Sequence, residues 1–216
     1  MKNRVAAKMS EISVLDYGAG NVSSVIRMIE RAGGQAHRIS SPAEVSKATK
    51  LVIPGVGAFD YGMSQLELRD LLPALATAAL ENAIPVLGIC LGMQLMCRVS
   101  QEGKMSGLGW IDAQVLRFSF TNGDGLRVPH MGWNTIQVPR KNQLLATNSG
   151  EQRFYFVHSY YVACNDPTDP IAITDYGGEF VAAFQRNNLF GVQFHPEKSH
   201  RFGMEVISNF LRFPHA

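Results

Sequence analysis

The sequence has little cysteine and no long apolar run, and these two features argue against a disulfide-rich protein and a membrane protein. Its three cysteines, Cys90, Cys97 and Cys164, form no CxxC pair and no even-numbered framework. This argues against a disulfide scaffold and fits a reducing cytosol. No apolar stretch approaches the roughly 18 residues of a membrane helix, and the basic N-terminal residues lack the apolar stretch of a signal peptide. We therefore expect a cytoplasmic protein that is not embedded in a membrane.

The chain also lacks an excess of charge of either sign. Its 216 residues carry 20 Lys and Arg against 18 Asp and Glu, a formal charge of +2. Such a small charge does not favour nucleic acid or an anionic membrane as partner. The length suits one domain with a sizeable core. We expect residues 1–10 to be a flexible extension and residues 11–216 to form a single domain.

Strand and helix signals alternate through the first half of the chain. Apolar runs predict strands at Glu11–Asp16, Gln35–Ile39, Lys50–Ile53 and Ile84–Ile89. The segments between them predict a helix from Val22, a short capped helix at Ser41–Glu44 and helical sequence over about 60–82. This order predicts an α/β fold: a mostly parallel central sheet flanked by helices. In such sheets, ligand sites collect at the carboxyl ends of the strands.

The second half changes character. From Leu108 to Phe194 the signals are mainly strand-like, with turns at Asn122–Gly125 and Gly177–Gly178. We interpret this part as an added, mainly β portion on the same core. A final helix is expected over about 201–213.

Cys90 follows a buried strand within Gly88-Ile89-Cys90-Leu91-Gly92 and precedes apolar helical sequence. This is the cysteine form of the nucleophile elbow, a sharp strand-to-helix turn that exposes the thiol. The N-terminus of the following helix favours the thiolate, which is the reactive species. The alternative is a small buried hydrophobe at a turn, a common place for free cysteine. We interpret Cys97, seven residues later in the same helical pattern, as core filler.

His195 and Glu197 lie in a second segment that follows a predicted strand, Gln193-Phe194-His195-Pro196-Glu197. Proline keeps the preceding residue extended, and residues two apart in an extended run face the same side. A cysteine nucleophile needs an imidazole base and a group that orients it, and these two residues supply both. The alternatives are a structural histidine, a solvated glutamate, or half of a metal site with His200, which lacks further clustered ligands.

These segments, together with four others, resemble the class I (triad-type) glutamine amidotransferases, whose fold is flavodoxin-like. The narrower resemblance, over nearly all of residues 11–212, is to the glutaminase-subunit family of imidazole glycerol phosphate synthase. The four other segments are Asp16–Asn21, Pro54–Phe59, Val128–Asn134 and Phe154–Tyr160.

The resemblance implies a Cys-His-Glu triad acting on L-glutamine. Cys90 would attack the side-chain carboxamide, His195 would shuttle the proton, and Glu197 would orient His195. The oxyanion hole would comprise Gly55, Val56, Gly57 and Leu91, although Gly55 and Gly57 can equally be simple turn glycines.

The resemblance also implies binding residues. Gln94, His158, Ser159 and Tyr160 would bind glutamine, although Gln94 can instead be a surface amide and the preceding residues a buried strand. A partner-facing surface would include Asn21, Pro129, Met131, Gly132, Trp133 and Asn134, although a buried Trp is nearly as common. No cofactor and no metal are implied.

The implied function is hydrolysis of glutamine to glutamate and ammonia, with the ammonia passed to a (β/α)₈-barrel synthase subunit. The products there would be imidazole glycerol phosphate and AICAR, in histidine biosynthesis. The alternative is a paralogous subunit that supplies ammonia for amidino groups on surface sugars. A cysteine hydrolase of γ-glutamyl substrates is more distant, and a nucleotide-binding module lacks both the GxGxxG pattern and a Walker lysine.

Overall fold

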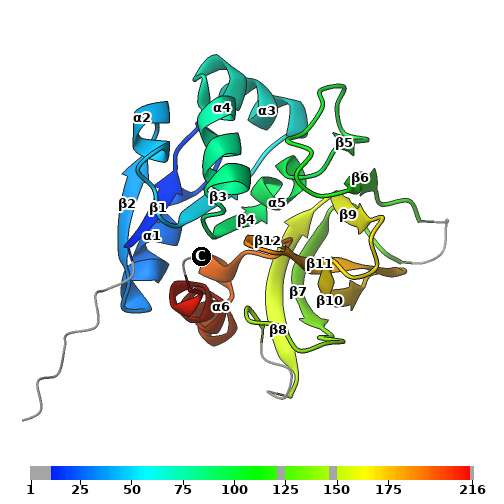
Figure 1. Ribbon diagram of the computed structural model, residues 1–216. Helices are drawn as coiled ribbons and strands as arrows, with labels where there is room; N and C mark the ends of the chain where they lie inside the picture. The colour runs from blue at the N-terminus through cyan, green and yellow to red at the C-terminus, as the bar shows by residue number, and fades with distance from the viewer. Residues whose placement is uncertain (1–10, 121–124, 146–149, 215–216) are drawn as a thin grey trace, which may run out of the picture.

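The computed structural model describes residues 11–120, 125–145 and 150–214. Their centre is a ten-stranded sheet of order β2-β1-β3-β4-β12-β11-β9-β6-β5, with β10 paired to β11 (Figure 1). Its strands are β1 (Glu11–Leu15), β2 (Gln35–Ile39), β3 (Leu51–Gly55), β4 (Val86–Cys90), β5 (Val99–Ser100), β6 (Ala113–Arg117), β9 (Tyr160–Cys164), β10 (Pro170–Asp175), β11 (Glu179–Arg186) and β12 (Leu189–Val192). The expected extension over 1–10 and most of the turn at 122–125 lie outside the described residues.

The parallel half of the sheet is the part predicted from alternating signals. Strands β2, β1, β3, β4 and β12 run parallel to one another. Gly55 is the register partner of Cys90 across β3 and β4. The carboxyl ends of these strands therefore bring the turns after β3, β4 and β12 to one edge, where a site is expected.

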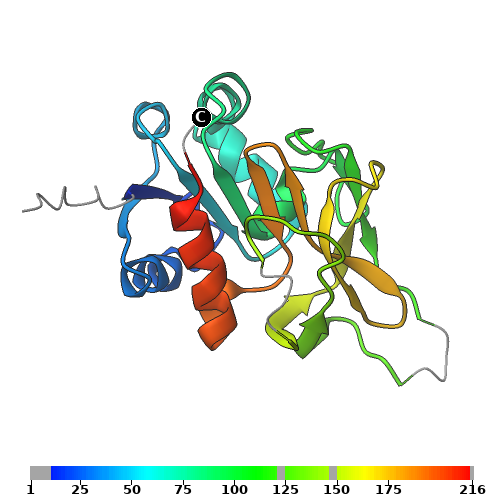
Figure 2. The ribbon, with the colours of Figure 1, turned by 60° about the horizontal axis from the view of Figure 1, so that its bottom comes forward.

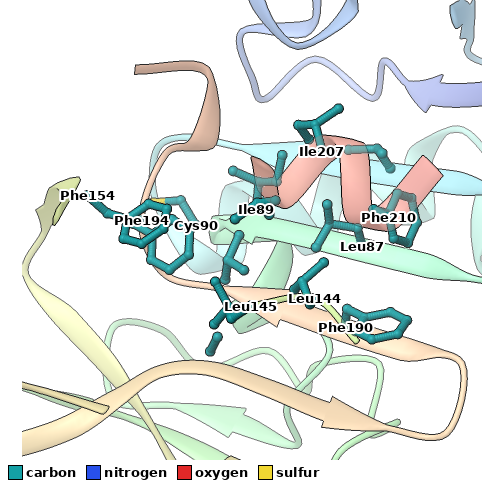
Figure 3. Packing of buried hydrophobic residues seen from close by; sticks show 14 of the residues in the cluster. Leu87, Ile89, Cys90, Leu144, Leu145, Phe154, Phe190, Phe194, Ile207 and Phe210 are labelled. Carbon is teal, nitrogen blue, oxygen red and sulfur yellow. The ribbon is translucent and has the colours of Figure 1, made fainter. Parts of the chain in front are cut away.

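Helices cover both faces of the parallel half (Figure 1). One apolar cluster packs α1 (Val22–Arg31) and α6 (His200–Arg212) on the sheet, and the other packs α3 (Phe59–Leu68), α4 (Leu71–Ala76) and α5 (Leu91–Leu95) on the opposite face. Figure 3 shows Ile207 and Phe210 of α6 over Leu87 of β4, with Cys90 at the end of that strand. The nucleophile candidate thus sits at the edge of a packed core, on a strand that has little freedom to move.

Most of the second half continues the same sheet. Strand β11 pairs antiparallel with β12, β9 and β10, and the chain turns at Gly177 and Gly178 as expected. Only β7 (His130–Ile136) and β8 (Gln152–His158) leave it, as a separate antiparallel ribbon. Figure 2 shows this ribbon between α6 and β10.

The structure defines the three predicted helical segments more closely. The helical sequence expected over about 60–82 comprises α3, α4 and a π turn (Thr77–Glu81), and Asp70, in a left-handed conformation with φ 53°, separates α3 from α4. The capped helix α2 is one turn long (Pro42–Val45). Helix α5 ends at Leu95, whose carbonyl accepts from Leu108 N–H at 2.8 Å, so Cys97 is buried beyond the helix and not within it.

Candidate active site

The Cys90 backbone is held in a strained elbow between β4 and α5. Its φ of 53° and ψ of −107° are unusual for a residue with a side chain, and such outliers concentrate at functional sites. A Cβ atom at Gly92 would lie 1.8 Å from the Ile53 carbonyl oxygen, and one at Gly88 would lie 2.6 Å from the Gly92 oxygen. Both glycines are therefore required for β3, β4 and α5 to approach this closely.

His195 and Glu197 form a buried pair directly after β12. His195 Nδ1 lies 2.8 Å from Glu197 Oε1, with side chains 1% and 4% exposed. His195 is extended, as its proline neighbour predicts, but Pro196–Lys198 form a 3₁₀ turn. The expectation that both residues share one side of an extended run is therefore wrong, and it is the turn that folds the carboxylate back onto the imidazole.

The electrostatics of the site favour a charged imidazole. Burial lowers the pKa of His195, but the negative charge and hydrogen bonding of Cys90 and the Glu197 carboxylate outweigh it and raise the pKa to about 10. Because Nδ1 donates to Glu197, Nε2 is the nitrogen left to serve the Cys90 thiol; it is buried and has no hydrogen-bond partner among the described residues. The arrangement supports a thiolate–imidazolium pair.

The backbone of His195 is fixed on both sides by Tyr155 of β8. His195 N–H donates to the Tyr155 carbonyl at 2.9 Å. In return, Tyr155 N–H donates to the Ser199 hydroxyl at 3.0 Å, and that hydroxyl donates to the His195 carbonyl at 2.6 Å. The sequence does not single out Ser199, because nothing local shows which carbonyl its hydroxyl meets.

A cavity of about 310 Å³ opens at Cys90. Its lining comprises Val56, Gly57, Cys90, Leu91, Gln94, Glu102, Pro129, Val157, His158, Ser159 and Tyr160. The structure thus brings the proposed nucleophile together with most of the proposed oxyanion and substrate residues. Gly55 lies beside Cys90 in the sheet, where a Cβ would meet Leu91 Cβ at 2.7 Å.

Glu102 is the acidic side chain among the residues that line the cavity, and sequence reasoning missed it. Its Oε2 accepts from Phe59 N–H, the first residue of α3, at 2.9 Å. Burial raises the pKa of this carboxyl. A lone glutamate after a predicted helix carries no motif, so only the tertiary structure reveals its place.

Gln94 is buried and already hydrogen-bonded. Its Nε2 donates to the Tyr160 carbonyl and to Gln193 Oε1, both at 3.0 Å. The surface-amide alternative for Gln94 is therefore wrong. Because both N–H groups are in use, the carbonyl oxygen is the atom left to receive a ligand.

His158, which lines the cavity, begins a hydrogen-bonded chain of three side chains from β8 to β7. His158 Nδ1 lies 2.7 Å from the Tyr160 carbonyl and must donate to it. His158 Nε2 then accepts from His130 Nδ1 at 3.2 Å, and His130 Nε2 faces Asn134 Nδ2 at 3.4 Å. Burial lowers the pKa of His158 to about 3 and that of His130 to about 4, so both rings are neutral and their tautomers are fixed.

The residues assigned to a partner surface do not all lie in the same kind of place. Pro129 lines the cavity, and Met131 and Trp133 on β7 are 62% and 40% exposed. Trp133 stacks on the His200 ring at 5.3 Å, so it is not a buried core residue. Gly132 lies between them on β7 with φ 134°.

The other two partner-surface residues have local structural bonds. Asn21 caps α1, with its side chain accepting from Ser24 N–H at 3.3 Å. Asn134 donates to the Asp175 carbonyl at 2.8 Å. A role of this surface in binding stays a prediction.

The family model for "Glutamine amidotransferase class-I" matches residues 13–213. The chain belongs to this family. Solved structures share the fold at low identity. PurLQS from Thermotoga maritima has a TM-score of 0.72 at 16% identity, covering 94% of this chain and 98% of its own. The glutaminase domain of Trypanosoma brucei CTPS has a TM-score of 0.64 at 18% identity, covering 94% and 91%.

Curated relatives narrow the family further. Two proteins named imidazole glycerol phosphate synthase subunit HisH 2, from Methanococcus maripaludis and Pseudomonas aeruginosa, are each 45% identical, covering 93% of this chain and 98% of the relative. The subunit HisH of Leptospira interrogans is 42% identical, covering 92% and 98%. Within the class I glutamine amidotransferases, the chain therefore belongs to the HisH subunits.

The described part of the chain offers neither a metal site nor a membrane span. No group of three or more His, Cys, Asp and Glu side chains there is arranged to hold a metal ion. Within the same residues, no helix combines the length and apolar character that crossing a membrane requires.

Proposed function

We propose that this protein is the glutaminase subunit of imidazole glycerol phosphate synthase, hydrolysing L-glutamine for histidine biosynthesis. The observation that carries the proposal is the elbow thiol of Cys90 at the cavity, backed by the buried His195–Glu197 pair at 2.8 Å. The Cys90 thiolate attacks the glutamine carboxamide, and His195 gives its proton to the leaving ammonia. His195 then activates the water that hydrolyses the γ-glutamyl thioester.

The amino-acid end of glutamine requires groups that recognise an ammonium. The carboxylate of Glu102 and the free carbonyl oxygen of Gln94 line the cavity together, and both are acceptors suited to an ammonium. Ser159 and Tyr160, which follow β8, also line the cavity and offer backbone and hydroxyl groups to the carboxylate.

The developing oxyanion requires N–H donors aimed at it. Leu91 N–H, the first of α5, is one candidate, and the Gly55–Gly57 segment supplies the other. Gly57 has φ 111° and open space where a Cβ would be. This leaves the Val56–Gly57 peptide free of side-chain obstruction on the cavity side.

The ammonia requires an acceptor on another chain. Free ammonia is protonated in water and lost, so a protein that only hydrolyses glutamine is useful when a partner receives its product. We propose a (β/α)₈-barrel synthase as that partner, docked on the face that carries Met131 and Trp133.

The test is glutamate release from glutamine, measured alone and with the barrel synthase plus its nucleotide ligand, with Cys90→Ala as control. We expect low activity alone and at least tenfold stimulation in the complex, abolished by Cys90→Ala. Equal activity with and without the barrel would contradict the assignment of partner. Activity that survives Cys90→Ala would contradict the mechanism.

One observation is compatible with a different acceptor for the ammonia. Two of the relatives at 45% identity carry the number 2 in their names, as a second copy in one organism would. Hydrolysis stimulated by a different barrel, such as one that builds amidino groups on sugars, would retain the triad and change the pathway.

A further inference from the structure

Gln193 is a fully buried polar residue directly after β12 that the triad mechanism does not use. Its Oε1 accepts from Gln94 Nε2 at 3.0 Å, and its Nε2 lies 3.7 Å from Cys90 Sγ. The amide therefore connects the nucleophile to a residue that lines the cavity.

The orientation of this amide follows from its neighbours. Gln94 donates both of its N–H groups, to the Tyr160 carbonyl and to Gln193. Gln193 must therefore present its oxygen to Gln94, which leaves its NH₂ facing the sulfur. If Gln193 only supported Gln94, its side-chain oxygen would be sufficient. Its NH₂ group, which faces the Cys90 sulfur, therefore indicates a second role.

We propose that Gln193 is a positioning residue whose side-chain N–H holds the Cys90 sulfur as a thiolate and links it to the bound amino-acid substrate through Gln94. The inference rests on the glutaminase function proposed above and adds to it. A buried N–H donor favours the charged form of its acceptor. The same donor restricts the position of the sulfur relative to His195. The substrate carbonyl must approach the sulfur from the side that faces away from this donor.

The chemistry of the remaining cysteines makes the test specific. Burial raises the pKa of the Cys97 thiol well above its usual range and that of Cys164 to about 12. Iodoacetamide at pH 5–8 therefore reports mainly on Cys90, and Cys90→Ala measures the background. This readout requires no glutamine turnover.

The experiment compares the pH profile of alkylation in wild type and Gln193→Met, which keeps the length of the side chain and removes both polar ends. We expect the midpoint of the profile to rise by about one unit, so that alkylation below it slows about tenfold. In the complex with the barrel synthase, kcat should fall about tenfold while KM changes less than threefold, because Gln94 keeps its bond to Tyr160.

Two further variants keep the test decisive. Gln193→Asn is too short to span Gln94 and the sulfur and should shift the profile in the same direction if Gln193→Met does not fold. Gln185→Met, the same substitution on the neighbouring strand β11, should leave the profile unchanged. Wild-type profiles in the Gln193 variants, or an equal shift in Gln185→Met, would overturn the inference. If wild type never releases ammonia but the Gln193 shift is seen, the proposed function fails and the role of Gln193 at the thiol stands.

Discussion

Lys50 shows how a single buried charge joins two elements that are distant in the sequence. The residue precedes β3 and is fully buried, and its ammonium donates to the carbonyls of Phe210, Leu211 and Phe213 at 2.8–3.0 Å. These carbonyls end α6, where a cation complements the helix dipole. Burial lowers the Lys50 pKa to about 8, so the amine stays mostly charged at neutral pH.

Lys50→Met should lower the free energy of unfolding by about 2–4 kcal/mol, because it removes one charged donor from several buried acceptors. Urea unfolding followed by circular dichroism measures this. Lys47→Met replaces an exposed lysine nearby and should change stability by less than about 0.5 kcal/mol. Similar losses in both variants would show that the three hydrogen bonds contribute little.

At the scale of elements, the contact between α6 and the turn at Pro196 positions the imidazole. A Cβ atom at Gly203 would lie 1.9 Å from the Pro196 carbonyl oxygen. The helix therefore packs backbone to backbone against the turn that carries His195 and Glu197. Few side chains intervene, so a displacement of α6 moves the base directly.

Gly203→Ala should therefore reduce glutaminase kcat at least tenfold and lower stability by about 2 kcal/mol or more, because α6 must move away from the turn. The measurements are steady-state kinetics in the complex and thermal unfolding. Ser208→Ala on the same helix is the matched control, since it adds no atom at this contact. Full activity in Gly203→Ala would mean that the turn holds its shape without α6.

The β7–β8 ribbon is the element best placed to meet a partner. It leaves the main sheet, carries exposed Met131 and Trp133, and is bonded to His195 through the Tyr155 backbone. Apolar and aromatic side chains of this kind anchor interfaces.

If the ribbon forms the proposed interface, Met131→Glu should weaken binding of the barrel synthase by about tenfold or more, because a carboxylate would have to be desolvated there. Titration calorimetry measures the affinity, and alkylation of Cys90 checks that the site is intact. Leu80→Glu, at an exposed apolar residue outside the ribbon, should bind as wild type does. Unchanged affinity in Met131→Glu would remove the ribbon from the interface.

At the scale of the whole molecule, the features that depend on local sequence patterns could be predicted from the sequence. The features that depend on tertiary contacts could not. The alternation of strands and helices, the β2 limits and the turn at Gly177–Gly178 follow from periodicity and glycine. The short length of α5 does not follow from the sequence pattern, because at its end the Leu95 carbonyl accepts a hydrogen bond from the distant Leu108 N–H.

The same division holds for the candidate site. Cys90, His195 and Gln193 all lie in motifs, but the contacts of Gln193 with Gln94 and the Cys90 sulfur, and the place of Glu102 in the cavity lining, depend on tertiary contacts that no spacing reveals. The assignment of 1–10 as an extension and of 11–216 as one domain remains a prediction.

The buried histidine pair should make the whole fold sensitive to acid. His158 and His130 are neutral in the fold, with their pKa values lowered to about 3 and 4. The unfolded chain, with ordinary histidines near 6.5, binds more protons over this range. Stability is therefore lost as pH falls below about 6.5, by roughly 2 kcal/mol from His158 alone at pH 5.

Urea midpoints at pH 7 and pH 5 test this expectation. The double variant His130→Gln/His158→Gln should lose much of the acid sensitivity, whereas His37→Gln, at an exposed histidine, should keep it. If the double variant is as acid-sensitive as wild type, other groups control the effect.

The crowding at Gly92 has a consequence for copies of this chain that diverge. The obstacle to a side chain there is the Ile53 carbonyl oxygen at 1.8 Å, and a backbone atom cannot rotate out of the way as a side chain can. A copy with any other residue at position 92 must therefore move α5 away from β3, and the elbow that presents Cys90 moves with it. Such a copy should lose its glutaminase activity even where the complete triad is retained.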